Sequence, residues 1–114
     1  SCTFPKSLRL LKRPEFQQTW RQGRKKHTPH YIVVVYHHDG AISRIGITAS
    51  RKTGNAVHRN RIKRRVREFF RQHRVSLQSG VDISVIAKKG AARLDYAAVC
   101  CELGGFFRDE GLIS

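Results

Sequence analysis

Acidic residues are scarce in this sequence. Only 8 of its 114 residues are Asp or Glu, against 23 Lys or Arg. Two-metal phosphodiester cleavage and general acid–base catalysis need carboxylates placed close together, whereas these eight are scattered, several at positions typical of helix caps and turns. The sequence therefore predicts no catalytic residue in the protein itself.

Cysteine is also rare, with three residues in all. Cys100 and Cys101 are adjacent, where a bridge between them would be strained, and Cys2 lies near the start of the chain. Nothing pairs these thiols into a disulfide framework or a zinc knuckle. We expect reduced cysteines and no metal site in the protein.

Long apolar runs are absent. No stretch approaches the roughly 20 residues that a helix needs to span a bilayer. The first residues, SCTFPKSLRLLKR, have neither the apolar core nor the small-residue cleavage site of a signal peptide. These absences predict a cytoplasmic protein.

Positive charge is what the chain has in excess, with a formal net charge of +15. Hydrophobic residues make up 39%, which is enough for a folded core. The length predicts one domain over residues 1–114. Residues 1–12 are basic and have little periodicity, so we expect them to form a flexible arm. The charge points to a polyanionic partner, nucleic acid first and an anionic membrane second.

The basic residues concentrate between Ser50 and Arg74, where 10 of 25 residues are Lys or Arg. Gly54 permits a tight turn, and Asn55 is a good N-cap for one long helix because its side chain can accept an orphan helix N–H group. The apolar residues of that helix recur at helical spacing and predict one buried stripe, made of Ile62, Val66, Phe69 and Phe70. The opposite side carries Asn60, Arg64, Arg67 and Arg71.

A solvated face is the ordinary explanation of a basic helix, but three observations favour a polyanion-binding surface. Acids hardly balance the cations, so repulsion within the helix costs stability. Arg greatly outnumbers Lys, and Arg forms forked contacts with phosphate. The basic run also starts before the helix, at Arg51 and Lys52, so that turn and helix could follow one phosphate backbone.

The residues before the long helix predict one helix and three strands. Pro14 and Gly23 are suited to the ends of a short helix that places Phe16 and Trp20 on one face. The basic connector that follows can hold a short edge strand. Residues 30–37 are β-branched and aromatic and predict a strand, and Asp39-Gly40 predicts a hairpin whose return strand lies at about 44–50.

After the long helix, alternation predicts a strand over 81–87, and a small basic loop follows at 88–90. Asp95 can cap a last helix, in which Gly104-Gly105 predicts fraying or a kink. The fold class is therefore α+β: one small domain with the order αβββαβα, and a four-stranded sheet packed with helices. Side-chain alternation puts Ile32, Val34 and Tyr36 on one face of their strand and Tyr31, Val33 and Val35 on the other.

Residues 50–64, SRKTGNAVHRNRIKR, resemble the Arg-Asn-Arg signature of the bacterial ribonuclease P protein family. The usual form has a Ser-Lys-Lys start, a Gly-Asn-Ala turn and Arg-Asn-Arg-x-Lys-Arg in the helix; here Arg51 replaces the first Lys and keeps its charge. RLLKRPEFQQTW, RIGITASRK and VIAKKGAARLDY resemble the family in the same order. The resemblance implies a left-handed crossover around the long helix, where the general rule gives a right-handed one.

The resemblance also implies a function. In this family the protein is an accessory subunit of ribonuclease P, whose RNA, with bound Mg²⁺, removes the 5′ leader of precursor tRNA by hydrolysis. The implied partners are ribonuclease P RNA and precursor tRNA, with no membrane, and the protein is monomeric in the holoenzyme. The residues implied to bind the catalytic RNA are Arg51, Lys52, Asn55, Arg59, Asn60, Arg61, Lys63, Arg64 and Arg67. Those implied to line a shallow cleft for the leader are Phe16, Trp20, Ile32, Val34 and Tyr36, with Tyr36 standing in for an aromatic that many relatives carry near position 34.

Other classes of function stay open at this point. A stand-alone RNA-binding or ribosome-associated protein would share the basic helix and never confer cleavage. A small protein-only nuclease would use one of the six histidines; we expect His37-His38-Asp39 to be an exposed turn, and His58 to be packed or near RNA. Peripheral membrane binding is disfavoured because the helix needs its apolar stripe for the core.

Overall fold

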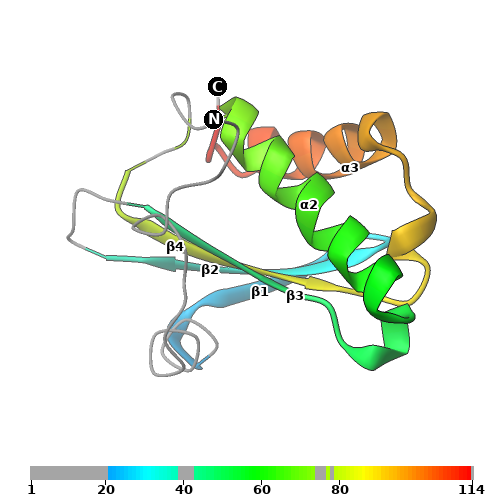
Figure 1. The fold of residues 1–114 in the computed structure, drawn as a ribbon. Helices are drawn as coiled ribbons and strands as arrows, with labels where there is room; N and C mark the ends of the chain where they lie inside the picture. The colour runs from blue at the N-terminus through cyan, green and yellow to red at the C-terminus, as the bar shows by residue number, and fades with distance from the viewer. Residues whose placement is uncertain (1–20, 39–42, 74–76, 78, 114) are drawn as a thin grey trace.

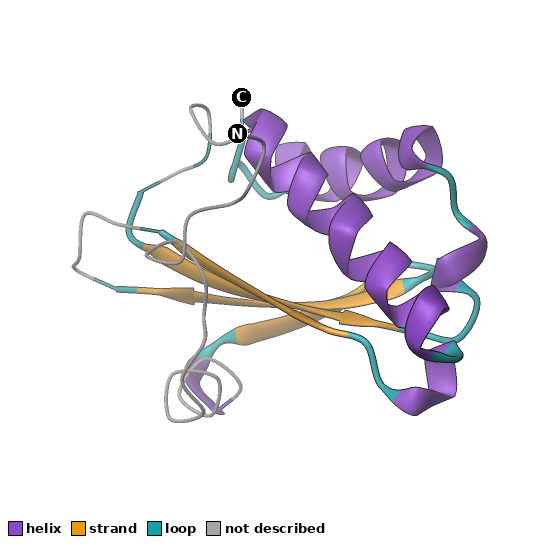
Figure 2. Ribbon diagram, in the orientation of Figure 1, coloured by secondary structure: helices purple, strands orange, loops and turns teal. Residues whose placement is uncertain are grey.

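The computed structural model describes residues 21–38, 43–73, 77 and 79–113. In this part of the chain two α-helices cover one face of a four-stranded sheet (Figures 1 and 2). The elements are β1 (Arg24–His27), β2 (Tyr31–His37), β3 (Arg44–Thr48), α2 (Ala56–His73), β4 (Val81–Ala87) and α3 (Tyr96–Asp109), with the 3₁₀ turns η2 (Arg51–Thr53) and η3 (Ala91–Arg93). Most of the predicted helix, including Phe16 and Trp20, lies outside the described residues. The arm 1–12 and the Asp39-Gly40 turn also lie outside them.

The strand order is β1-β2-β4-β3. β2 pairs antiparallel with both β1 and β4, whereas β3 pairs parallel with β4. The expected return strand therefore exists, but its predicted hairpin pairing with β2 is wrong. β4 lies between them because six of its seven residues are buried, which suits a central strand covered on both faces. The hand of the β3–α2–β4 crossover stays a prediction from the family resemblance.

Helix α2 has the cap and the buried stripe that the sequence predicts. The backbone N–H of His58 donates to Oδ1 of Asn55 over 3.0 Å. The buried side chains are Ile62, Val66, Phe69 and Phe70. Phe69 and Phe70 pack against Phe107 of α3 with ring centroids 6.0 and 5.3 Å apart, and this aromatic cluster joins the two helices over the sheet.

Helix α3 begins at Tyr96 and is capped, as predicted, by Asp95, whose side chain accepts the N–H of Ala98 over 2.8 Å. The expected fraying at Gly104-Gly105 is wrong, because residues 96–109 are helical throughout. Gly104 is buried, and a Cβ atom there would lie 3.6 Å from the Phe69 ring and 3.1 Å from the Arg108 guanidinium. Close packing of α3 on α2 thus offsets the low helix propensity of glycine.

The two faces of β2 are those that the alternation predicts. Tyr31, Val33 and Val35 belong to the core beneath the helices. Ile32, Val34 and Tyr36 lie on the face of the sheet opposite α2 and α3. Ile32 and Tyr36 are half-buried on that face, whereas Val34 has no exposed surface.

Candidate RNA-binding surface

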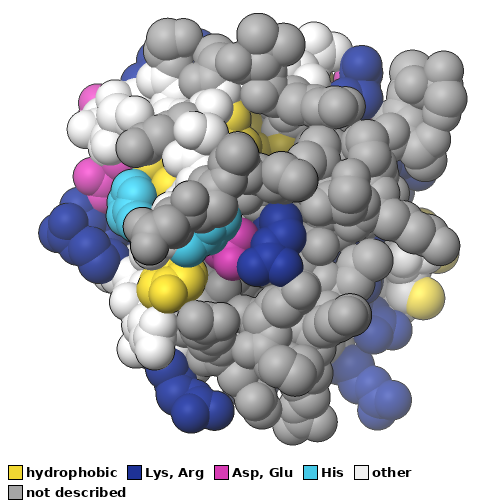
Figure 3. Space-filling model, turned by 90° about the vertical axis from the view of Figure 1, so that its left-hand side faces the viewer, with side chains coloured by type: hydrophobic (Ala, Val, Ile, Leu, Met, Phe, Trp, Pro, Cys, Tyr) yellow, Lys and Arg dark blue, Asp and Glu magenta, His cyan; other side chains and the backbone are white. Residues whose placement is uncertain are grey.

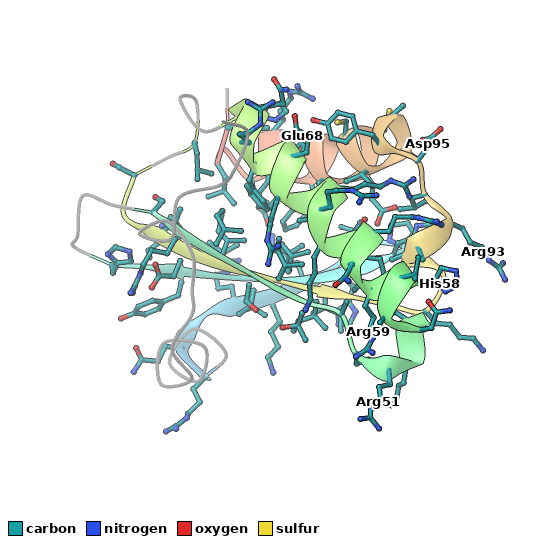
Figure 4. The ribbon with its side chains drawn as sticks, in the orientation of Figure 1. Arg51, His58, Arg59, Glu68, Arg93 and Asp95 are labelled. Carbon is teal, nitrogen blue, oxygen red and sulfur yellow. The ribbon has the colours of Figure 1, made fainter. Side chains whose placement is uncertain are left out.

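Cationic side chains gather where α2 begins. Figure 4 shows Arg51, His58 and Arg59 at this end of the helix, with Arg93 extending from the neighbouring connection between β4 and α3. An open hollow lies between these two segments. It is lined by Lys52, Thr53, Gly54, His58 and Arg61 on one side and by Lys89, Gly90, Ala92 and Arg93 on the other.

A tight turn sets the position of the first cations. Thr53 bonds to the carbonyl of Ser50 through its N–H over 3.0 Å and its hydroxyl over 2.6 Å. Gly54 follows with φ +137°, and a Cβ atom at this position would lie only 2.7 Å from Nδ1 of His58. The chain can therefore reverse directly from Arg51 into the start of the helix.

Arg65 fixes the second segment against the helix. Its guanidinium donates to the carbonyl of Leu94 over 2.5 Å and to that of Ala92 over 3.4 Å. These bonds hold the residues around η3 beside α2. The sequence predicts that the other arginines between residues 59 and 65 bind RNA. Arg65 was not in that set, and the structure gives it this structural role.

The predicted RNA-binding residues all retain accessible surface. The exposed ones are Arg51, Lys52, Asn55, Asn60 and Arg64, and the half-buried ones are Arg59, Arg61, Lys63 and Arg67. Arg71, which was not assigned to this set, donates to Glu68 from Nε over 2.9 Å and from a terminal nitrogen over 2.5 Å. Hydrogen bonds from Arg71 and then Gln72 lower the pKa of Glu68 to about 2, so this end of the helix is partly neutralised.

Lys89 and Arg93 are candidate site residues that sequence reasoning did not assign. The basic loop at 88–90 was the available signal, but its distance in sequence from the helix concealed their proximity. The left-handed backbone of Gly90 and the η3 turn bring these cations to the far side of the hollow. Together with Lys52 and Arg61 they form a concave basic surface, and Lys and Arg side chains are common donors to phosphate oxygens.

The opposite face of the sheet holds the described part of the predicted leader cleft. Ile32 and Tyr36 offer partly exposed surface there, and Val34 offers none. At the end of this face where β2 stops and β3 and β4 begin, histidine, acidic and basic side chains lie together (Figure 3). They include Asp82, which accepts two hydrogen bonds from Arg44, over 3.1 and 2.8 Å.

The histidines bear on the nuclease alternative. His37 is exposed, but it is the last residue of β2 and not part of a turn. His38 is half-buried with Nε2 3.2 Å from Oδ1 of Asp82, so it too differs from the expected exposed turn. His58 lines the basic hollow. Among the described residues, no three His, Cys, Asp or Glu side chains gather into a group that could hold a metal ion. Within the same residues, no helix is long and apolar enough to cross a membrane.

Comparison with known sequences gives one consistent family. The family model described as Ribonuclease P matches residues 4–110. The ribonuclease P protein component of Citrifermentans bemidjiense is 48% identical over 107 residues, covering 94% of this chain and 91% of the relative. That of Desulforapulum autotrophicum is 44% identical over 108 residues, covering 95% and 92%.

Solved structures agree. The RNase P protein of Staphylococcus aureus superimposes with a TM-score of 0.87 at 29% identity, covering 96% of this chain and 100% of that one. The RNase P protein of Thermotoga maritima gives 0.80 at 31% identity, covering 89% and 96%. A mutant of the S. aureus protein, described as defective in mRNA degradation activity, gives 0.87 at 29% identity, covering 95% and 92%.

Proposed function

The chain belongs to the ribonuclease P protein family, and on this premise we propose that it is the monomeric, cytoplasmic protein subunit of a bacterial ribonuclease P. It binds the catalytic RNA and the 5′ leader of precursor tRNA. In doing so it assists the Mg²⁺-dependent endonucleolytic cut that releases a mature tRNA 5′ end.

The basic surface at the start of α2 is the observation that supports this proposal most directly. Arg51, Lys52 and Arg64 are exposed, and Arg61 faces Lys89 across the hollow. Such a surface binds a structured RNA through contacts with its phosphates and through its shape, with few hydrogen bonds to base edges. The catalytic RNA is therefore its proposed ligand.

The leader is proposed to run along the face of the sheet opposite α2 and α3. Tyr36 and Ile32 supply partly exposed surface there, and Phe16 and Trp20 complete the proposed set from outside the described residues. Stacking of a base on an aromatic ring contributes about 1–3 kcal/mol and tolerates any base. That tolerance suits an enzyme that must accept many leader sequences.

Mg²⁺ is proposed to be held mainly by the RNA, where it would supply the metal-assisted hydrolysis. The side chains that line the hollow are mostly basic. Among the described residues, no group of three His, Cys, Asp or Glu side chains could hold a metal ion. What the protein's own residues provide is positive charge between two polyanions. Because that charge offsets phosphate repulsion, less Mg²⁺ should be needed for cleavage.

Cleavage of a leader-bearing precursor tRNA at low Mg²⁺ tests the proposal. Three mixtures are compared: the protein alone, a bacterial ribonuclease P RNA alone, and both together. We expect cleavage only with both. Binding of the RNA without any gain in cleavage would favour a stand-alone RNA-binding protein, and cleavage by the protein alone would reveal an active site in the chain.

An unstructured mRNA fragment added to the protein-alone mixture extends the test. This addition tests whether the mRNA degradation activity named for the S. aureus relative is also present in this protein. Degradation of that fragment while precursor tRNA stays intact would separate this activity from tRNA maturation.

A further inference from the structure

Asp82 is the only buried acidic residue in the part of the chain that the structure describes, with 3% of its surface exposed. It lies at the start of β4, the central strand between β2 and β3. Nε of Arg44 donates to Oδ1 over 3.1 Å, and a terminal nitrogen of the same guanidinium donates to Oδ2 over 2.8 Å. Nε2 of His38 lies 3.2 Å from Oδ1.

Stability alone is a weak reason for this arrangement. Removing a carboxylate and a guanidinium from water is costly, and well-packed apolar side chains often stabilise such a position as well or better. The choice of residue is also unusual for this chain. One of only eight acids stands beneath an arginine, on the sheet face over which a polyanion is proposed to run.

What the carboxylate achieves is geometric. The forked contact engages Nε–H and one terminal N–H of the Arg44 guanidinium and fixes the plane of the group. The Arg44 side chain keeps 30% of its surface exposed, so the held guanidinium can still meet a ligand.

The register places this guanidinium beside the proposed stacking ring. Asp82 is the cross-strand partner of Tyr36 on β2 and of Arg44 on β3, so the three residues form one row across the face opposite α2 and α3. His38 lies next to the row, with its ring centroid 6.4 Å from that of Tyr36. A base on Tyr36 would have its own phosphate within the span of this row.

We propose that Asp82 is a positioning residue for the single-stranded leader: it holds the Arg44 guanidinium where it contacts a leader phosphate while the base lies on Tyr36. This inference rests on the proposed function, because it takes the leader as the strand on this face. It adds a phosphate contact and its supporting carboxylate to a cleft predicted only from apolar and aromatic residues.

Electrostatics and positioning predict opposite results for Asp82→Asn. The substitution removes a negative charge from an RNA-binding face, so by Coulomb attraction alone the affinity for RNA should rise. If Asp82 positions Arg44, the affinity for leader-bearing RNA should fall instead. The sign of the change therefore distinguishes the two roles.

The test uses the holoenzyme reconstituted with a bacterial ribonuclease P RNA. Binding of a precursor tRNA with a 5′ leader and binding of the mature tRNA are measured with the wild-type protein and the variants. For Asp82→Asn we expect affinity for the precursor to fall by about tenfold, the size of one charge-assisted hydrogen bond, with mature tRNA binding unchanged. Unchanged or tighter precursor binding would overturn the proposal, and so would equal losses for both RNAs.

Arg44→Lys keeps the charge but removes the fork, and it keeps the proposal testable if Asp82→Asn folds poorly. It should reproduce the selective loss for the precursor. Glu102→Gln is the matched control, because Glu102 also holds a histidine, accepting from Nδ1 of His30 over 2.8 Å, but it lies on α3. It should leave the ratio of precursor to mature tRNA affinity unchanged. Thermal unfolding of each protein checks that the variants fold.

Failure of the two proposals can be told apart. A wild-type holoenzyme that binds precursor and mature tRNA equally well would overturn the leader role itself. A wild-type preference for the precursor that survives intact in folded Asp82→Asn and Arg44→Lys would overturn only the positioning role.

Discussion

At the scale of single residues, two glycines show how differently the same substitution can act. Gly54 has φ +137° and would place a Cβ atom 2.7 Å from the His58 ring, whereas Gly105 lies in α3 with open space around it. We predict that Gly54→Ala lowers the free energy of unfolding by about 1–3 kcal/mol, through backbone strain and the clash. Gly105→Ala should raise it by about 1 kcal/mol, through helix propensity. Urea denaturation measures both, and an equal effect of the two would contradict this account of the turn.

Glu68 gives a second prediction at this scale. Hydrogen bonds from Arg71 and Gln72 lower its pKa to about 2. Because the pKa is lowered in the folded state, its stabilising contribution is present above the usual Glu value and is lost as the pH falls toward 2. An NMR titration should find the low value, and Arg71→Gln should return it toward 4.5. An ordinary pKa in the wild-type protein would contradict the ion pair.

At the scale of elements, α2 divides its work between an aromatic stripe and a cationic face. Arg51 and Arg64 are exposed, so replacing both by Gln should leave the thermal midpoint nearly unchanged. It should weaken binding to the catalytic RNA and reduce the salt dependence of that binding by nearly one for each lost phosphate contact. Arg108→Gln, at an exposed arginine of α3, is the matched control. An unchanged salt dependence in the double variant would contradict the phosphate contacts.

Helix α3 is tied to the turn between β1 and β2 by one carboxylate. Glu102 accepts from the hydroxyl of Thr28 over 2.6 Å and from the backbone N–H of His30 over 2.8 Å. Burial raises its pKa, but these hydrogen bonds outweigh burial and keep the pKa below its usual value. Glu102→Gln should therefore cost about 1.5–3 kcal/mol at neutral pH, and the difference should shrink as the pH falls through the lowered pKa. Chemical denaturation at several pH values measures it; a constant difference would mean that the charge of Glu102 is irrelevant.

At the scale of the whole molecule, the net charge of +15 acts on stability and binding in opposite directions. Self-repulsion destabilises the free protein, and salt screens it. We predict that raising NaCl from about 0.05 to about 0.5 M increases the thermal midpoint of the free protein while it weakens the complex with RNA. Calorimetry and binding assays over the same series test both parts. A thermal midpoint that does not change with salt would show that the charges are already compensated within the fold.

The sequence by itself determined the local structure and the chemical character of the surface. Asn55 and Asp95 cap the helices, the stripe of α2 is buried as predicted, and β4 has the predicted bounds. These features depend on interactions within a few residues, through caps and side-chain periodicity, and a sequence displays them directly. The chemistry of the Arg-rich helix is equally visible, because it depends on residue type.

Only the tertiary structure decided which distant segments meet. β4 enters between β2 and β3, although Asp39-Gly40 favoured a hairpin, because a strand buried on both faces belongs at the centre of the sheet. That insertion puts Asp82 beside Arg44, and the fold of the β4–α3 connection puts Lys89 and Arg93 opposite the start of α2. These contacts depend on burial and strand pairing between residues far apart in the chain. The secondary-structure propensity of each segment therefore does not predict them.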